Sequence, residues 1–392
     1  MIKVHKIQLK INNKQKTYCA KASGISRFAY NWALNQWNEQ YKSGKKPTES
    51  KLRKQLNSIK KEEFPWMYEV TKVAPQQGIK NLGEAFKRFF KKQSSYPKYK
   101  KKYVDDSFRA DNGPATKGED AVKIEGKQIK IPVLGWVKLT ERLRFKGQIK
   151  SVVISRIANC WYAAISVDVS DTPIIFENQG EVGVDLGITT LAIYSTGTIK
   201  KSLKPYNFLL KRVRLLQKKL SRAKKKGKNR EKIKTKLAKL HARIANIRID
   251  MTHKITFDLV KNFSGICIEN LNVRGMLKNR KLSRHIMDCN FYEFSRQLKY
   301  KCQWYARKLV IADRFFASSK ICNNCNHKNI DLKLADRRWE CPNCHKLHNR
   351  DLNAALNLLQ YFYDANKLVR RASPDFKPVG EESAGAETFV TA

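Results

Sequence analysis

The sequence predicts an α/β protein with several domains, and two patterns along the chain lead to this prediction. Residues 121–170 alternate apolar and polar side chains in short runs, which is typical of antiparallel strands. Residues 205–251 repeat apolar side chains every three or four positions, which is typical of paired helices. With 392 residues, the chain is long enough for two or three domains with separate hydrophobic cores.

The first 104 residues predict one strand followed by helices. Residues 1–17 alternate apolar and polar side chains, as one strand would. Helical spacing follows over residues 24–90, with a separate helix predicted over 73–90. Residues 86–109 interleave aromatic and basic side chains, which can stack on bases and hold phosphates. The alternative for this segment is a set of core aromatics beside a solvated basic face.

The middle of the chain predicts a small β-barrel and then a helical hairpin. The alternating segment 121–170 should form antiparallel strands, with a hairpin turn at Ala158–Asn159, and the N-terminal strand should complete the barrel. The helical pattern of 205–251 breaks at Gly227, so two helices should pair through their apolar seams. Most Lys and Arg residues of this segment lie outside the seam.

The rest of the chain predicts one more helix and a disordered tail. Phe, Leu and Tyr side chains share one stripe over residues 290–307, which indicates a helix. The segment after residue 371 is rich in Gly, Ser, Ala and Glu, so we expect it to be disordered.

The net charge indicates a polyanionic partner. The chain has 80 Lys and Arg residues against 34 Asp and Glu residues, a formal net charge of +46. Neutralising phosphates releases counterions, so a basic protein binds nucleic acid tightly and in a salt-dependent way. The alternative is a solvated basic surface, as on a ribosome-associated protein, and this too would contact nucleic acid.

The sequence favours a cytoplasmic location. The first 16 residues contain no apolar segment typical of a secretory signal, and no run reaches the ~18–20 apolar residues that span a membrane. We therefore expect no membrane partner. In a reducing cytoplasm the nine cysteines are more often metal ligands or free thiols than disulfides.

Four cysteines predict a structural zinc site. They lie in the two CxxC segments CNNC and CPNC, fifteen residues apart: Cys322, Cys325, Cys341 and Cys344. Each segment supplies two thiolates, and four thiolates close the tetrahedral shell of one Zn²⁺; free or redox-active thiols are the alternatives. Asn326 and His345 follow the two segments at turns where Gly is common, so a left-handed backbone is expected there. His327, His345 and His348 are substitute ligands that four cysteines make unnecessary.

Three acidic residues lie at the ends of predicted elements. Asp185 ends the apolar run EVGVD, Glu269 ends GICIE, and Asp351 opens the helical segment RDLNAALNLL. Each has a simple structural interpretation, as a turn former, a strand-end surface residue and a helix-capping acid, respectively. Together they are the ligands that two Mg²⁺ ions about 4 Å apart need for phosphodiester hydrolysis, with Asp185 as the bridging ligand.

These motifs resemble those of a known family. GVDLGITTLA, IENLNVRGM, CNNC with WECPNC, and RDLNAALN resemble segments of the TnpB proteins of bacterial and archaeal transposons, the OrfB group, related to compact type V CRISPR effectors. Less specific matches are FAYNWALNQW, PQQGIKNLGEAFKRFFK, YPKYKKK, SFR and DRFFASSKICNNC. The matches keep the expected order over roughly residues 20 to 360.

The resemblance implies an RNase H-like (RuvC-type) nuclease domain with an inserted four-cysteine zinc ribbon, a wedge-like β-barrel and a helical recognition domain. The implied parts are a wedge-like barrel at 1–17 and 105–180, recognition helices at 18–104, a RuvC-like domain at 181–316 and 349–370 with a helical hairpin and lid region at 205–260, a zinc ribbon at 317–348, and a disordered tail at 371–392.

The resemblance also implies roles for individual residues. Asp185, Glu269 and Asp351 fall on the catalytic, Mg²⁺-binding triad, and the four cysteines fall on the zinc ribbon. The candidate nucleic-acid contacts are Lys72, Gln76, Lys80, Arg109 and Arg350; Gln and Lys side chains can read base edges but are equally common on solvated helices. Arg350 either steadies a phosphate or a triad carboxylate or is a surface charge. Asn349 departs from the family, which usually has Asp there (HDRD, here HNRD).

The implied activity is an RNA-guided, Mg²⁺-dependent DNA endonuclease. A guide RNA from the transposon end would pair with double-stranded target DNA beside a transposon-adjacent motif, and the expected assembly is a monomer with one RNA in the bacterial or archaeal cytoplasm, associated with the nucleoid. The alternatives are a guided DNA-binding repressor that does not cut, a compact type V CRISPR effector, and a transposase that joins strands itself.

Overall fold

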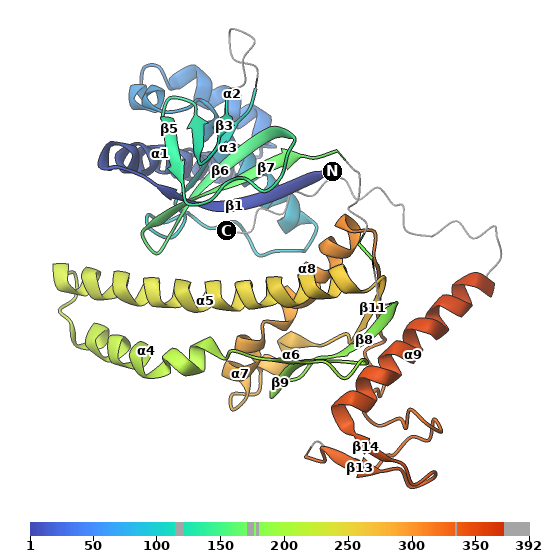
Figure 1. The fold of residues 1–392 in the computed structure, drawn as a ribbon. Coiled ribbons are helices and arrows are strands. Elements are labelled where there is room, and N and C mark those ends of the chain that lie inside the picture. Colours follow the sequence, from blue (N-terminus) through green and yellow to red (C-terminus); the bar gives the residue numbers. More distant parts are fainter. Residues whose placement is uncertain (114–120, 171–175, 178–179, 334, 372–392) are drawn as a thin grey trace. The chain divides into compact units, whose positions relative to one another are not determined.

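The structure of the protein is a computed structural model that describes residues 1–113, 121–170, 176–177, 180–333 and 335–371 (Figure 1). The chain divides into two compact units, one from Met1 to Asp171 and one beginning at Thr172, and each is described by itself. The expectation of a disordered tail concerns residues 372–392, which lie outside the described residues, apart from Arg371 at the end of a helix.

The first unit contains one antiparallel sheet with the strand order β2-β6-β7-β1-β5-β4-β3. Its strands are β1 (Ile2–Lys10), β2 (Ser107–Asp111), β3 (Lys123–Glu125), β4 (Gln128–Ile131), β5 (Gly135–Leu139), β6 (Gln148–Ile157) and β7 (Cys160–Asp168). The N-terminal strand β1 pairs with β7 over most of its length and with β5 at its end, so it joins the two halves of the sheet. Within the described residues no pairing joins the end strands β2 and β3, so a closed barrel is not found.

Two local predictions in this sheet have different outcomes. The hairpin turn at Ala158–Asn159 is confirmed: both residues have positive φ, 50° and 69°, as a two-residue hairpin loop requires. The prediction of a strand through residue 17 is wrong, because β1 ends at Lys10 and a helix begins at Asn13. The reason is a capping box, in which the Asn12 side chain accepts from the Gln15 N–H (2.8 Å) and the Gln15 side chain accepts from the Asn12 N–H (3.1 Å).

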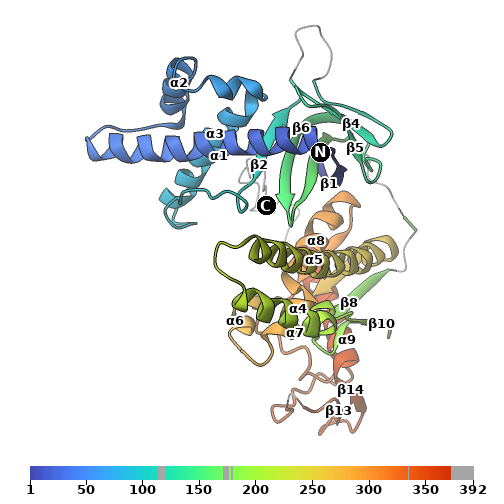
Figure 2. The same cartoon turned by 90° about the vertical axis from the view of Figure 1, so that its left-hand side faces the viewer.

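Helices of the first unit pack beside this sheet: α1 (Asn13–Lys42), α2 (Glu49–Ile59), the 3-10 helix η1 (Pro65–Glu69) and α3 (Val73–Phe90). The predicted helix over 73–90 is confirmed as α3. Figure 2 shows α3 beside the long helix α1. The two helices approach closely at Gly78, which has no side chain; a Cβ atom there would lie only 2.4 Å from the Ser26 carbonyl oxygen. Phe86 of α3 stacks on Trp37 of α1, with ring centroids 4.0 Å apart, and therefore belongs to the core.

The second unit is built on a mixed five-stranded sheet with the order β10-β9-β8-β11-β12. Its strands are β8 (Glu181–Asp185), β9 (Thr190–Tyr194), β10 (Ile199–Lys201), β11 (Gly265–Ile268) and β12 (Lys308–Ile311). The three strands β8, β11 and β12 are parallel, whereas β9 and β10 are antiparallel to their neighbours. Parallel strands place their carboxyl ends at one edge of the sheet.

Helices cover both faces of this sheet. The helices of the unit are α4 (Pro205–Arg222), α5 (Lys228–Asn262), α6 (Val273–Leu277), α7 (Ser283–Cys289), α8 (Phe291–Trp304) and α9 (Arg350–Arg371). Ile266 and Ile268 of β11 share a core with α5 and α8, whereas Cys267 between them packs with Leu358 and Phe362 of α9. Because successive side chains of a strand point to opposite faces, α9 lies opposite α5 and α8.

Gly183 lets α9 approach β8 closely. A Cβ atom at Gly183 would lie 2.0 Å from the Ala355 carbonyl oxygen and 2.5 Å from the Leu359 nitrogen, both in the backbone of α9. We expect Gly183→Ala to lower the free energy of unfolding by about 1–3 kcal/mol or more, because a rigid helix backbone cannot move aside. Urea unfolding followed by circular dichroism measures this. The control is Gly24→Ala, where the new methyl group would meet only the Arg27 side chain at 3.8 Å; equal midpoints for the two variants would contradict the prediction.

The predicted helical hairpin is confirmed as α4 and α5, with Gly227 in the connection between them (Figure 1). Its seam contains Val213, Leu240 and Ile244. Asp288 of α7 is buried, is hydrogen-bonded by the Arg248 guanidinium at 2.9 and 2.7 Å, and accepts from the two backbone N–H groups that begin α4. This carboxylate therefore holds the hairpin to α7.

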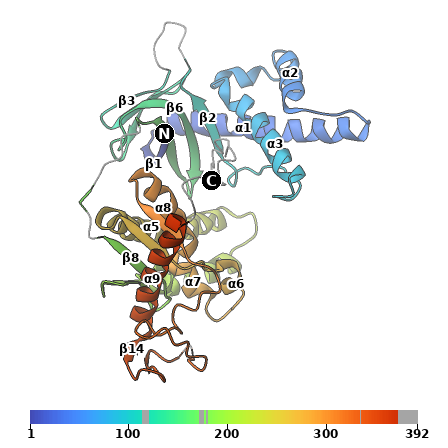
Figure 3. The same cartoon turned by 90° about the vertical axis from the view of Figure 1, so that its right-hand side faces the viewer.

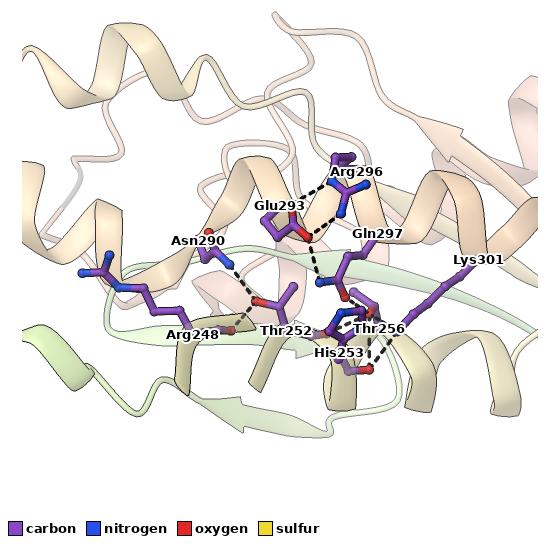
Figure 4. A network of polar contacts seen from close by, with 9 residues as sticks. All are labelled: Arg248, Thr252, His253, Thr256, Asn290, Glu293, Arg296, Gln297 and Lys301. Atoms are coloured by element: carbon purple, nitrogen blue, oxygen red, sulfur yellow. Dashed lines mark hydrogen bonds and ion pairs between the residues drawn. The ribbon is translucent and has the colours of Figure 1, made fainter. Parts of the chain in front are cut away.

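A buried polar network joins α5 to α8 (Figure 4). The Lys301 ammonium donates to the His253 carbonyl oxygen (2.9 Å) and to Thr256 Oγ1 (2.7 Å). Thr256 contacts Gln297 at 3.0 Å, and Gln297 donates to Glu293 at 3.0 Å. Burial lowers the pKa of Lys301 to about 8. Because each of these groups has a partner, the network fixes the position of α8 on α5 without leaving a buried polar atom unsatisfied.

No helix among the described residues is long and apolar enough to cross a membrane.

Candidate active site and metal centre

The three predicted acids come from three elements of the second unit. Asp185 is the last residue of β8, and Glu269 directly follows β11. The two strands are parallel neighbours with Val184 opposite Ile268, so both carboxylates lie at the same edge of the sheet. Asp351 lies in the first turn of α9, the helix that packs across β8 and β11. The fold therefore gathers residues that lie far apart in the sequence.

The surroundings of Asp185 and Glu269 disfavour the charged form of both carboxylates. Burial is the main cause that raises the pKa of Asp185 well above its usual value, and the charges of Glu269 and Asp351 raise it further. Burial also raises the pKa of Glu269. Burial and nearby like charges both disfavour ionisation of a carboxyl group. A bound cation would stabilise the ionised carboxylates.

The acids have partners that set their positions. Ser318 Oγ donates to Glu269 Oε1 at 2.5 Å, and the Ser318 carbonyl oxygen accepts from the Asn357 amide on α9 at 2.7 Å. Arg337 Nη1 lies 3.1 Å from Asp351 Oδ1. Ser318, Asn357 and Arg337 were not predicted; the only signal for Ser318 was its place in the DRFFASSK segment.

Arg350 is buried and is not a surface charge. Its guanidinium donates to the Lys333 carbonyl oxygen at 2.5 Å and to Ser319 Oγ at 3.2 Å. Its positive charge lowers the pKa of both Asp185 and Glu269. Arg350 therefore offsets part of the repulsion within the acid cluster.

Asn349 caps α9. Its Oδ1 accepts from the N–H groups of Asp351 (3.2 Å) and Leu352 (3.1 Å), at the start of the helix. Asn and Asp are about equally good in this position, so the departure from the family pattern preserves the cap that places Asp351.

The four predicted cysteines meet at one point. Among the described residues, they are the only group of three or more His, Cys, Asp or Glu whose ligand atoms all lie within 4.8 Å of one another, so the three carboxylates are more widely spaced. Two Sγ–Sγ distances are 3.6 Å, between Cys322 and Cys344 and between Cys325 and Cys341. Four sulfurs at ~2.3 Å from a tetrahedral Zn²⁺ would be about 3.8 Å apart, so the cluster has the size that zinc needs.

Local geometry supports this cluster. Cys322 and Cys341 pack with Trp339 of the small sheet that β13 (Arg338–Glu340) and β14 (Leu347–Asn349) form. The helix α9 continues directly from β14 (Figure 3). Asn326 and His345 have φ values of 61° and 56°, so the expected left-handed backbone is confirmed. A hydrogen bond from the Asn343 side chain is the main cause that lowers the pKa of Cys325, to about 6, which favours the thiolate.

Side-chain partners are found for two of the three candidate histidine ligands, His348 and His345. His348 Nε2 lies 3.0 Å from Cys322 Sγ and its ring packs on Trp339, so it contacts a predicted ligand. His345 Nδ1 contacts Glu340 at 3.0 Å and is exposed.

The other predicted nucleic-acid contacts lie in the first unit. Lys72, Gln76 and Lys80 are spaced four residues apart at α3, so they share one face of the helix. The two lysines are exposed and Gln76 is half-buried. Arg109 of β2 forms an ion pair with Asp111.

Three family profiles match the chain. The profile described as "Probable transposase" (OrfB_IS605) matches residues 164–280, "Cas12f1-like, TNB domain" matches residues 291–358, and the "Helix-turn-helix domain" profile of the OrfB_IS605 group matches residues 1–46.

Alignments with similar proteins cover nearly the whole chain. A "Putative RNA-guided DNA endonuclease" of Streptomyces pristinaespiralis is 34% identical over 360 residues, covering 88% of this chain and 86% of the relative. The "Putative RNA-guided DNA endonuclease InsQ" of Escherichia coli K12 is 30% identical over 377 residues, covering 91% and 92%. The solved structure "Cryo-EM structure of the Cas12f1-sgRNA-target DNA complex" contains a chain with a TM-score of 0.58 and 14% identity, covering 91% of this chain and 98% of that one.

The structural likeness shows a mixed α/β fold shared with Cas12f1, and the sequence likeness shows the relationship. The chain belongs to the TnpB family of transposon-associated proteins, the OrfB group.

Proposed function

We propose that the protein is an RNA-guided endonuclease that cleaves target DNA beside a transposon-adjacent motif, by metal-assisted phosphodiester hydrolysis at Asp185, Glu269 and Asp351. The observation that carries this proposal is the acid cluster, in which strand ends and a helix start bring three carboxylates to one edge of the sheet. Its setting supports the proposal, because the relatives that align over most of the chain are named RNA-guided DNA endonucleases.

The donor set fits Mg²⁺. Carboxylate oxygens are the ligands that this ion prefers, and burial, followed by the charges of Glu269 and Asp351, raises the pKa of Asp185, which a bound cation would offset. The chemistry that two such ions supply when bound is activation of a water and stabilisation of the leaving oxygen. Asp185, Glu269 and Asp351 are the residues that would hold the ions, and Asp185 interacts electrostatically with both of the other acids. Ser318 orients Glu269, and Arg350 and Arg337 limit the repulsion.

For the rest of the chain we propose the division that the family implies. The second unit would hold a RuvC-like nuclease domain with a structural zinc ribbon, bound through Cys322, Cys325, Cys341 and Cys344. The first unit would hold the wedge-like sheet and the recognition helices. A guide RNA and double-stranded DNA are the proposed partners, because a net charge of +46 favours binding to polyanions.

Lys72, Gln76, Lys80 and Arg109 remain the candidate contacts to DNA or RNA in this proposal. Arg350 is better placed to support the carboxylates than to hold a phosphate, because its guanidinium already donates to Lys333 and Ser319.

A cleavage assay tests the function. The chain is co-expressed with its downstream genomic flank, the bound RNA is sequenced, and the complex is given a plasmid with the matching target beside a randomised motif, in Mg²⁺ or EDTA. Cutting that requires Mg²⁺, the RNA and one depleted motif is the expected result. RNA-dependent binding without cutting would instead support a guided repressor.

Ser318→Ala is expected to weaken cleavage at limiting Mg²⁺ by about ten- to a hundredfold, because a hydrogen bond to a charged group contributes about 1.5–3 kcal/mol. Since the hydroxyl only positions Glu269, raising the Mg²⁺ concentration should restore part of the rate. The measurement is the cleavage rate as a function of Mg²⁺ concentration. The matched control is Ser264→Ala at the other end of β11, whose hydroxyl donates to the Gly180 carbonyl oxygen at 3.0 Å; the same Mg²⁺ dependence in both variants would contradict the role of Ser318.

A further inference from the structure

Phe315 is the most exposed large apolar side chain among the described residues, with 88% of its surface accessible. Single exposed apolar residues are common on protein surfaces and need no special role. Two further observations separate Phe315 from them: the backbone that presents its ring is fixed on both sides, and that backbone leads directly to the acid cluster.

Several contacts hold the loop that carries Phe315. The Phe315 N–H donates to Asp313 Oδ1 at 2.8 Å, and the Asp313 N–H donates to the Tyr361 hydroxyl of α9 at 3.3 Å. The next residue, Phe316, packs its ring on the same Tyr361, with centroids 4.8 Å apart. The neighbours on both sides are thus attached to α9, while the Phe315 ring remains in solvent.

The same loop ends at the proposed active site. Ser318, three residues after Phe315, donates to Glu269 and is tied to α9 through Asn357. Three residues of extended chain span at most about 11 Å, so the Phe315 Cα lies within that distance of the Ser318 Cα. The strand before the loop, β12, pairs with β11 up to Ile311, and the Ala312 N–H bonds to the Ile268 carbonyl oxygen, beside Glu269. The loop therefore runs along the edge of the sheet where the acids lie.

The chemistry around Phe315 suits a nucleic-acid strand. Arg314 is exposed beside it, and Arg337 is exposed where it pairs with Asp351 of the acid cluster. Lys320, five residues after Phe315, is half-buried and donates to the Ile330 carbonyl oxygen at 2.6 Å. Aromatic rings that stack on bases, together with basic side chains that hold the phosphates, are the general means of binding single strands. Stacking of this kind tolerates any base, because every base has a π face.

We infer that Phe315 is a stacking platform for an unpaired base of the DNA strand presented to Asp185, Glu269 and Asp351. This inference rests on the proposed nuclease function. A base stacked on the Phe315 ring would fix the DNA backbone on either side of that base. A neighbouring phosphate of the strand could then reach the three carboxylates. Phe315 is thus a positioning residue that acts on the substrate strand in a sequence-independent way.

The first test compares variants of the full chain with its guide RNA. Phe315→Leu and Phe315→Ala are expected to lower the cleavage rate at subsaturating DNA by about five- to a hundredfold, the range for loss of one base–aromatic contact. Phe315→Trp should keep the rate near that of the unchanged protein, since it retains the ring. Tyr292→Ala removes another exposed aromatic of the second unit, 71% accessible on α8, and should have no effect.

Abasic DNA identifies the contact. A series of DNA substrates carries one abasic site at successive positions near the cut. At one of these positions the abasic site should lower the cleavage rate of the unchanged protein. Phe315→Leu should cut that substrate as fast as it cuts intact DNA. If Phe315→Leu cuts intact DNA as fast as the unchanged protein, or if every abasic position slows both proteins equally, Phe315 does not stack on the substrate.

A binding measurement keeps this test independent of cleavage. Single-stranded DNA with 2-aminopurine at successive positions is added to the RNA complex in EDTA, and stacking is read as loss of fluorescence. Quenching with the unchanged protein and Phe315→Trp, but not with Phe315→Leu, is the expected result, and it would hold even if the protein failed to cut DNA. Equal quenching in all variants would overturn the inference, whether or not cleavage occurs; an RNA oligonucleotide that is quenched more strongly than DNA would overturn the assignment to the DNA strand.

Discussion

Replacing Asp185 by Asn is expected to lower the rate of DNA cleavage by about a thousandfold or more while RNA and DNA binding persist. Asp185 interacts with both Glu269 and Asp351, and its loss would remove one of the carboxylates that would hold the metal ions, whose contribution to catalysis amounts to several kcal/mol. Asn has nearly the same shape, so the strand β8 and its neighbours should remain in place. The measurement is single-turnover cleavage with the purified RNA complex, together with DNA binding in EDTA.

The same substitution has an expected sign for stability. Burial and the neighbouring carboxylates raise the pKa of Asp185, so the folded protein disfavours its charged form. Such a group makes stability fall as pH rises from the unfolded pKa, about 3.9, through the raised folded pKa. Asp185→Asn removes that loss, and its unfolding temperature at neutral pH in EDTA should equal or exceed that of the unchanged protein.

Asp258→Asn is the matched control, because Asp258 is a partly exposed acid of the same unit that pairs with Lys200 at 2.9 Å. It should cut DNA at nearly the unchanged rate. Cleavage by Asp185→Asn at the unchanged rate would show that the catalytic site lies elsewhere. Loss of RNA binding or of folding in this variant would show that Asp185 is structural.

Replacing Cys341 by Ser is expected to remove the bound zinc and unfold the ribbon. Structural zinc contributes about 10–16 kcal/mol of apparent binding free energy in small zinc domains. The three remaining thiolates should bind zinc more weakly, and the ribbon should lose most of this stabilisation. The metal content per chain, measured by mass spectrometry of the purified protein, should fall from about one zinc to a small fraction of one.

Cleavage should fall together with zinc content. The ribbon carries Arg337 at Asp351 and leads through Asn349 into α9, so its unfolding would release the end of α9 that positions Asp351. Cys160→Ser is the control, because Cys160 lies on β7 in the first unit, outside the cluster, and should leave the zinc content unchanged. Full zinc content in Cys341→Ser would exclude the four-cysteine site.

The features that could be predicted from the sequence are those that depend on near neighbours. The helix over 73–90, the hairpin turn at Ala158–Asn159 and the break at Gly227 are examples, since local geometry decides each. The end of the first strand at Lys10 was a local feature too, and the Asn12–Gln15 capping box was its signal. The spacing of the four cysteines likewise predicted a cluster that the fold brings together.

The sequence by itself thus predicted the helix over 73–90, the helical hairpin, the cysteine cluster and the three acids as candidates, because their signals are periodic or closely spaced. Only the tertiary structure decided what surrounds those acids. The parallel pairing of β8 with β11 places Asp185 and Glu269 at one edge, and the close approach of α9 at Gly183 adds Asp351. The contact of Ser318 with Glu269 and the exposure of Phe315 depend on packing between segments far apart in the chain, which no local pattern encodes.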